Sequence, residues 1–508
     1  MLTHGQIMAV LAGVMIGMLL AALDQSIVAT ALPTIAGDLG GFDQLSWVVT
    51  AYLLTATAAT PLFGKLGDLH GRRRMFQGAI VIFLVGSALC AIAGSMGLLI
   101  GARAVQGVGA GGLLSMAWAV VGDVVPPRSR GRYQGYLTAV FATASVSGPL
   151  LGGFFVDHLS WRWAFTINLP LGGVALIITT LFLRLPDRRI DRSLDYLGAA
   201  LLVGSVSALL LVSEWGGEEY AWGSPTIVLL CVATLVLGVL FVLQERCAPE
   251  PILPLRLFRN PSFRIATSVS VIVGPAVFGI IVFMPLYFQV VHGSTATASG
   301  LLTAPLTFGL LALAIYSGRT ISNHGRYRMF PIIGLSCTTI GLVLLALTTS
   351  TSAHLWAPAP ALVLIGAGLG TTMHVMMLAA QNAVPEGDLG VTSSSVSFCR
   401  SLGSVLGTAL FSAVLNHGIT ERLARTAGTT DAAAITAALH GTPSAIAALP
   451  PESKRQVLVA FADSFRGALA LGALFALASV VLAIRLPNVE LRESVGDPDA
   501  MLDPTLAV

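Results

Sequence analysis

Asp24 is the residue of this sequence with the clearest capacity for chemistry, because it is the only carboxylate well inside a long apolar stretch. A charged side chain at membrane depth is costly, so such a residue usually has a function. A carboxyl there could take up and release a proton, and it could also attract a cation. The alternative is a carboxylate at a helix end that water reaches, since Asp24 lies past the middle of its stretch. We favour the first interpretation and expect Asp24 to couple proton movement to transport.

Two arginines also lie in apolar stretches, Arg103 and Arg400. A guanidinium does not lose its proton in proteins, so each must find a carbonyl, a carboxylate or water. We expect Arg103 near the cytoplasmic third of its helix, where it either takes part in proton transfer or pins helices together. Three roles are open for Arg400: a substrate contact, a lock between two halves of the molecule, or packing with its head in a wet cavity.

Other chemistries find no support in the residue pattern. The five cysteines are far apart and form neither a metal spacing nor a disulfide framework. The segment 107–112 fits G-x-G-x-x-G, but no strand precedes it and it lies inside an apolar stretch, so it does not indicate a dinucleotide site. We therefore expect no metal and no cofactor apart from a proton, and we do not expect an enzyme.

The composition identifies the kind of molecule that positions these residues. The chain has 508 residues, of which 55% are hydrophobic and 10% are charged, whereas about 25% are charged in an ordinary soluble domain. This excludes a soluble enzyme and a disordered scaffold, and a net charge of +3 is too small to imply a nucleic-acid partner. An all-α membrane protein remains, with the lipid bilayer as its surroundings and a single chain as its functional unit.

Hydropathy predicts fourteen transmembrane helices, the first of them retained and not a cleaved signal peptide. Basic residues gather in the connections between spans 2 and 3, 4 and 5, 6 and 7, 8 and 9, and 10 and 11. The positive-inside rule then places both termini in the cytoplasm, for a multi-pass protein of the cytoplasmic (inner) membrane. The predicted spans are 7–32, 46–64, 76–95, 98–121, 133–156, 163–183, 194–213, 225–244, 265–290, 298–318, 330–349, 358–380, 391–415 and 465–486.

An internal repeat divides the chain. The segment 64–74 (GKLGDLHGRRR) has a later echo at 318–328 (GRTISNHGRYR), and the glycines in 107–111 match those in 366–370. Two parallel copies of a six-helix unit are therefore expected, with a substrate site between them near the membrane midplane. The predicted divisions are a bundle over 1–190, an inserted hairpin over 191–250, a bundle over 251–487 with a semi-ordered external loop over 416–464, and a disordered cytoplasmic tail over 488–508.

Four segments carry a resemblance to a known family. The segment 64–74 resembles the signature loop of the major facilitator superfamily, and 103–107 (RAVQG) resembles its fourth-helix motif. The segment 148–153 (GPLLGG) is similar to the fifth-helix motif of drug/proton antiporters, and 23–33 (LDQSIVATALP) resembles the first-helix motif of the fourteen-helix branch. The resemblance spans nearly the whole chain and implies the major facilitator fold.

The resemblance also implies roles for particular residues. Arg103 and Gln106 would take part in proton transfer beside Asp24. Gly148, Pro149, Gly152 and Gly153 would form a close helix interface that limits leak and favours export. A conformational gate that favours the outward-facing state would comprise Gly64, Asp68, Gly71, Arg72 and Arg73, with Asp123 and Arg132 as partners.

The expected function is proton-coupled export of lipophilic drugs or antibiotics by alternating access. Flexible or aromatic side chains suit variable apolar substrates, and we place Tyr287, Met373, His374, Met377 and Arg400 in the cavity. No acid occurs over 251–385, so we expect a neutral or monocationic substrate. The alternative is export of a lipid or an endogenous secondary metabolite on the same scaffold, which a lateral opening between the halves would favour.

Overall fold

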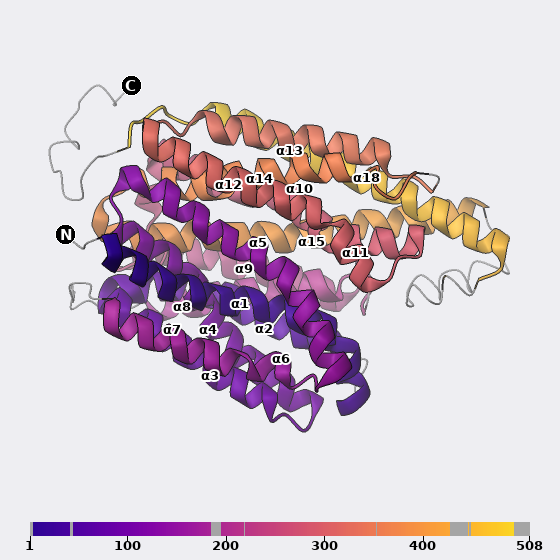
Figure 1. Cartoon of the computed structure of the whole chain (residues 1–508), viewed down its shortest axis with the longest axis horizontal. Helices are drawn as coiled ribbons and strands as arrows, with labels where there is room; N and C mark the ends of the chain where they lie inside the picture. The colour runs from indigo at the N-terminus through magenta and orange to yellow at the C-terminus, as the bar shows by residue number, and fades with distance from the viewer. Residues whose placement is uncertain are drawn as a thin grey trace.

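A computed structural model describes residues 4–40, 44–183, 195–217, 219–351, 353–426, 446 and 449–491. Within these residues, fourteen helices are long and apolar enough to cross a membrane, which confirms the predicted count. The fold is all-α, with two six-span bundles and an additional hairpin of two spans (Figure 1). The basic residues 184, 188, 189 and 192, most of the tail and the middle of the predicted external loop lie outside the described residues.

The N-terminal bundle, which we call the N-half, occupies the lower part of Figure 1 in indigo to magenta. Spans 1 to 5 are single helices, whereas the sixth consists of two helices in line. The break precedes Pro170, which lacks an N–H and whose ring excludes a continuous helical turn. The helices of the N-half are α1 (His4–Leu39), α2 (Leu45–His70), α3 (Arg72–Ala91), α4 (Met96–Val124), α5 (Pro127–His158), α6 (Trp163–Thr166) and α7 (Asn168–Phe182).

The C-terminal bundle, or C-half, lies above the N-half in orange to yellow. Its second span is also divided, because Pro305 begins a new helix after Thr303. The helices of the C-half are α10 (Pro261–His292), α11 (Ala296–Leu302), α12 (Ala304–His324), α13 (Met329–Thr348), α14 (Ala359–Asn382), α15 (Leu389–Thr426) and α18 (Pro451–Ile484), with short 3-10 turns η2 (Leu255–Arg259) and η3 (Glu386–Asp388).

The inserted hairpin consists of α8 (Tyr196–Trp215) and α9 (Pro225–Cys247), which pack on each other. It contacts both halves, since α8 lies against α2 and α15. The segment that follows α9 is also attached to the N-half, because Lys65 Nζ donates to Glu250 Oε2 at 2.6 Å. The hairpin therefore packs along the side of the two bundles where α2 meets α15.

Helices extend into both ends of the segment 416–464, which the sequence assigns to an external loop. α15 continues to Thr426, and α18 begins at Pro451. Pro451 occupies the first helical turn, where a missing N–H costs nothing. Buried apolar residues such as Val457 and Phe461 then extend the core from the first turns of α18, so hydropathy alone set the start of this helix too late.

One end of the bundle can be identified by the turn between α2 and α3. α1 begins and α18 ends at the left of Figure 1. Because successive spans alternate in direction, α2 ends and α3 begins at this same end, and Gly71 joins them. We call this the Gly71 end. Gly71 has a φ of +92°, in the region that only glycine adopts readily, so this sharp turn requires a glycine.

Candidate functional site

Asp24 lies at the centre of a buried hydrogen-bond network inside the N-half. Its side chain is 0% exposed. Arg103 Nη1 donates to Asp24 Oδ2 at 2.5 Å, and Gln106 Nε2 donates to Asp24 Oδ1 at 2.7 Å. Asn168 Nδ2 also donates to Oδ1, at 2.9 Å. The structure thus brings together the three residues expected at the proton site and adds Asn168 from α7.

Arg103 has partners on every side. Its Nε donates to the carbonyl oxygen of Val48 at 3.1 Å, and Nη1 also donates to Gln106 Oε1 at 2.7 Å. The guanidinium carbon lies 4.1 Å from the centre of the Tyr52 ring, a distance at which a cation is attracted to the ring face. This buried charge is therefore paired and hydrogen-bonded, as burial of an ion requires.

The position of Arg103 along its helix shows where in the bundle the network lies. Arg103 lies in the second turn of α4, whereas Asp123 at the other end of α4 pairs with Arg72 at the Gly71 end. Arg103 therefore lies toward the end of α4 that is farther from Gly71, and the network around Asp24 lies in the same part of the bundle.

Asp24 faces neither lipid nor bulk solvent, but it also does not face the other half. Its partners come from α4 and α7, and Ser87 on α3 accepts from both Gln106 and Asn168. Sequence reasoning missed Asn168 and Ser87. Asn168 carried a usable signal, because an amide in the apolar stretch 163–183 must find a buried partner.

A second charged cluster, which we call the latch, joins the halves at the Gly71 end. Arg72 Nη2 lies 2.6 Å from Asp68 Oδ1, and Arg72 Nε donates to Asp123. The second oxygen of Asp68 accepts from the backbone N–H of Val391 at 2.8 Å. Val391 lies in the first turn of α15, where the helix dipole attracts a negative charge. The latch therefore holds the start of a C-half helix against α2.

The remaining residues of the predicted gate occupy different places. Gly64 packs directly against Ser394 of α15, with no room for a side chain. Arg73 Nη2 donates to the carbonyl oxygen of Thr180 at 2.7 Å, at the end of α7. The structure does not pair Arg132 with Asp123: its backbone N–H donates to Ser322 Oγ of α12 at 3.1 Å, and its Nε donates to the Tyr136 hydroxyl at 3.2 Å.

Two glutamines form a further contact between the halves that the sequence did not reveal. Gln134 Nε2 on α5 donates to Gln381 Oε1 on α14 at 2.8 Å. Gln381 Nε2 donates to the carbonyl oxygen of Trp118 at 3.1 Å and to Ser393 Oγ at 2.8 Å. Together with the latch, this network closes the interface between the halves toward the Gly71 end.

The fifth-helix motif sets the distance between α1 and α5. A Cβ on Gly148 would overlap Ser26, and one on Gly152 would lie 2.9 Å from the carbonyl oxygen of Ile27. Small residues permit such close packing of membrane helices. Pro149 is half-buried on the same helix, and a Cβ on Gly153 would meet nothing within 4 Å. Gly148 and Gly152 therefore form the close interface, and Gly153 does not contribute to it.

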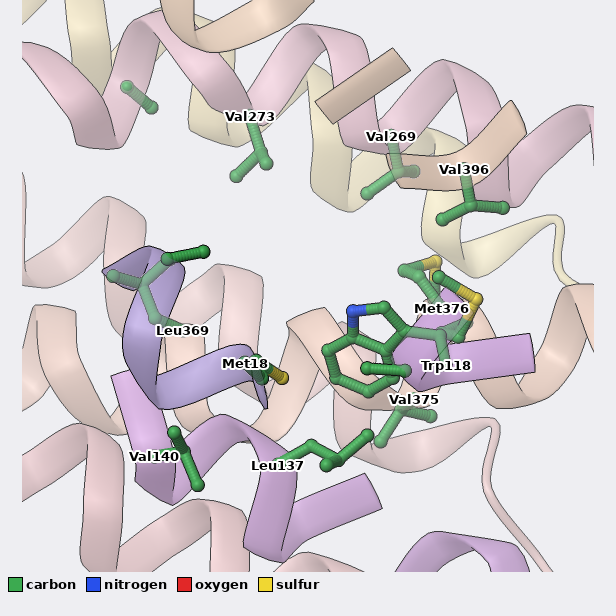
Figure 2. Close-up of a cluster of buried hydrophobic side chains, with 14 of the residues drawn as sticks. Met18, Trp118, Leu137, Val140, Val269, Val273, Leu369, Val375, Met376 and Val396 are labelled. Carbon is green, nitrogen blue, oxygen red and sulfur yellow. The ribbon is translucent and has the colours of Figure 1, made fainter. Parts of the chain in front are cut away.

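Apolar side chains from both halves face one another at the centre of the molecule (Figure 2). We call this set the central cluster. Trp118 projects from α4 into the region between the halves, and Val396 of α15 faces it from the C-half. The members labelled in Figure 2 are Met18, Trp118, Leu137, Val140, Val269, Val273, Leu369, Val375, Met376 and Val396.

Of the residues expected in a substrate cavity, the structure places Arg400 beside the central cluster, with its guanidinium carbon 5.8 Å from the Trp118 ring centre. Tyr287 instead donates to the carbonyl oxygen of Ser350 at 3.1 Å and stacks on Phe465 inside the C-half. His374 is buried against Ser317 of α12.

The three methionines of α14 differ in burial and in their place relative to the central cluster. Met376, which we had not selected, is labelled in the central cluster. Met377 is buried in the same apolar core, whereas Met373 is half-buried.

A groove of about 390 Å³ lies between α1 and α5 in the N-half. Its lining is almost entirely apolar and includes Leu11, Met15, Tyr133 and Val140. Both helices belong to the same half, so this groove is not the lateral opening between halves that would favour a lipid exporter.

The fourteen candidate spans and the paired bundles define a polytopic membrane protein. The sequence profile of the Major Facilitator Superfamily matches residues 14–408. The chain therefore belongs to the Major Facilitator Superfamily, and it is a membrane transporter and not an enzyme.

Relatives and solved structures agree with this assignment. The chain is 39% identical over 493 residues to the uncharacterized MFS-type transporter Rv1877 of Mycobacterium tuberculosis, covering 96% of this chain and 70% of the relative. It is 35% identical over 414 residues to multidrug resistance protein 3 of Bacillus subtilis, covering 82% and 80%. The fold matches the proton:xylose symporter XylE with a TM-score of 0.67 at 13% identity, covering 97% and 98%.

Proposed function

We propose that this chain is a proton-coupled antiporter that exports lipophilic compounds across the cytoplasmic membrane by alternating access, as a single chain. The observation that carries the proposal is the fully buried Asp24 carboxylate, which is paired with Arg103 at membrane depth. The naming of relatives as multidrug resistance proteins supports export as the direction. The basic loops support a cytoplasmic position for the Gly71 end and for both termini.

Protonation of Asp24 would remove one charge of its pair with Arg103. The neutral carboxyl keeps the hydrogen bonds from Gln106 and Asn168 but loses most of its attraction for the guanidinium. Arg103 then holds fewer charge-assisted bonds, which are the strong ones in this network. A proton at Asp24 therefore changes the forces on α4, which carries Arg103.

α4 is the helix that would connect protonation of Asp24 to the rest of the molecule. The same helix carries Arg103 near one end, Trp118 in the central cluster, and Asp123 in the latch. A shift of α4 is thus transmitted to the surface between the halves and to the contact that closes the Gly71 end. Closure at the cytoplasmic end, with the proton site toward the outside, is the arrangement that an outward-facing carrier requires.

The structure argues against one of the two expected substrate classes, the monocation. Asp24 is enclosed in the N-half and neutralised by Arg103, so it offers no free negative charge to a cation at the central cluster. Arg400 lies beside that cluster. We therefore propose a lipophilic substrate that carries no positive charge.

Gradient-driven export tests the proposal directly. Purified protein in liposomes with an imposed pH gradient should move a neutral lipophilic dye, and Asp24→Asn should abolish the gradient-dependent part. Asn fills the same space and keeps hydrogen-bonding groups but cannot exchange a proton.

The matched control is Asp38→Asn, at an exposed carboxylate near the C-terminal end of the same helix. This variant should transport as the wild type does. Unchanged gradient-driven export by Asp24→Asn would show that the coupling site lies elsewhere.

A further inference from the structure

Arg400 is a charged residue deep in the membrane without a protein counter-charge. It lies about 17 Å along α15 from the start of that helix, at 1.5 Å per residue. Its side chain is half-buried, and its guanidinium carbon lies 5.8 Å from the Trp118 ring centre of the opposite half. No ion pair holds it among the described residues. A cation in this position needs water or a ligand.

Two unused hydrogen-bond donors belong to the same region. The indole Nε1 of Trp118 is buried without a hydrogen-bond partner in the described part of the chain, and so is the hydroxyl of Ser397. Ser397 precedes Arg400 by three residues, so both side chains lie on the same face of α15. In Figure 2 the indole nitrogen lies on the side of the ring that faces the C-half. Buried donors without partners are rare in proteins.

The local charge is positive. α10 and α14, which pack beside α15, contain no acidic residue. On α18, which also packs on α15, Glu452 pairs with Arg455 and Asp463 with Arg466. The acid on α15 itself is Glu421, near its far end. Asp24 is neutralised by Arg103 within the N-half, and Asp68 and Asp123 are engaged by Arg72 at the Gly71 end. In the part of the chain that the structure describes, none of these carboxylates forms an ion pair with Arg400.

We infer that Arg400, Trp118 and Ser397 form a recognition site for the acidic group of an amphipathic organic anion, with the central cluster holding its apolar body. The guanidinium fork and the indole N–H are donors suited to a carboxylate. Met18, Val273 and Met376 provide apolar and adaptable contacts for the remainder of the molecule.

This inference rests on the proposed function and names its substrate class. The site uses a donor from each half, Trp118 from α4 and Arg400 from α15. A ligand held by both is released when the halves separate there, as alternating access requires.

A matched pair of probes tests the inference: pyrenebutyrate, which is ionised at neutral pH, and its uncharged methyl ester. Equilibrium binding of each to the purified full-length protein in detergent is measured by fluorescence polarisation, without any gradient. We expect the wild type to prefer the carboxylate. Arg400→Met should weaken carboxylate binding about tenfold or more, and Trp118→Phe about fivefold, with little change for the ester.

Arg455→Met is the control, because it removes an exposed positive charge near the beginning of α18. It should leave the binding of both probes unchanged. Arg400→Lys, which keeps the charge but not the planar fork, should retain part of the carboxylate preference.

Two results would overturn the inference: a wild type that binds the ester as tightly as the carboxylate, or an Arg400→Met variant that loses both equally. Transport of the same probes in liposomes separates this failure from that of the proposed function. If the gradient drives export of the ester and no carboxylate preference is found, the proposed antiport stands and the anion site is refuted. If binding is selective for the carboxylate but the gradient drives export of neither probe, the anion site stands and the proposed antiport is refuted.

Discussion

Asp24 and Arg103 are buried charges that persist because each supplies what the other needs. The carboxylate accepts from a guanidinium and two amides, and the guanidinium also reaches a carbonyl and an aromatic face. Removing one partner of a buried pair costs more than the pair contributes to stability, because it leaves an unpaired charge behind. Any step that neutralises Asp24 therefore has a large effect on Arg103, and this sensitivity suits a coupling site.

Asn168 offers a milder perturbation of the same network. Asn168→Leu removes the donor to Asp24 Oδ1, and we expect a loss of about 1–2 kcal/mol in stability together with slower gradient-driven export. Thermal unfolding in detergent and the liposome assay measure the two effects. The matched change Asn416→Leu, at an exposed asparagine of α15, should alter neither. If both variants behave alike, Asn168 has no part in the network's function.

The helices were easier to predict than the contacts between them. Hydropathy and length gave all fourteen spans, because an apolar stretch must satisfy its backbone hydrogen bonds as a helix in the membrane. The end of α15 at Thr426 and the start of α18 at Pro451 were missed, since helices that extend beyond the bilayer lose their hydropathic signal.

At the site, the one-turn spacing of Arg103 and Gln106 made their grouping predictable. The addition of Asn168 depends on tertiary packing that periodicity does not encode, and so does the meeting of Trp118 with Arg400. Met376 and Met377 are buried in the core whereas Met373 is half-buried, because the rotation of α14 about its axis is set by its neighbours.

The contact between α1 and α5 allows a test with two adjacent glycines. Gly152→Ala places a Cβ 2.9 Å from the carbonyl oxygen of Ile27, which is too close, whereas a Cβ on Gly153 meets nothing within 4 Å. We expect Gly152→Ala to push α1 and α5 apart and to reduce transport and thermal stability. Gly153→Ala should leave both unchanged or slightly improve stability, since alanine favours a helix more than glycine does. If both variants keep the transport and thermal stability of the wild type, this motif has no close-packing role.

The whole molecule consists of two bundles held together at the Gly71 end by the latch and by the pair Gln134–Gln381. These contacts must break if the halves are to rock about the central cluster. The inserted hairpin packs on α2 and α15, the helices that meet at the latch, so its contacts with one of the two halves must also change when the halves rock.

Cross-linking tests whether this separation is required. Cysteines placed at Gln134 and Gln381 in a background without the five native cysteines should be joined by a short bismaleimide, since the two side chains are in contact at 2.8 Å. We expect the linked protein to lose transport and the singly substituted proteins to retain it under the same treatment. Full transport by the linked protein would contradict rocking of the halves at this end.

The central claim is that Asp24 exchanges a proton for substrate, and proton release on binding tests it most directly. Addition of an uncharged lipophilic substrate to weakly buffered, purified protein in detergent should release protons, detected with a pH indicator dye. The account predicts release by the wild type and by Asp38→Asn, and none by Asp24→Asn, with binding of the substrate measured in parallel for all three. Undiminished proton release by an Asp24→Asn variant that still binds substrate would contradict the account.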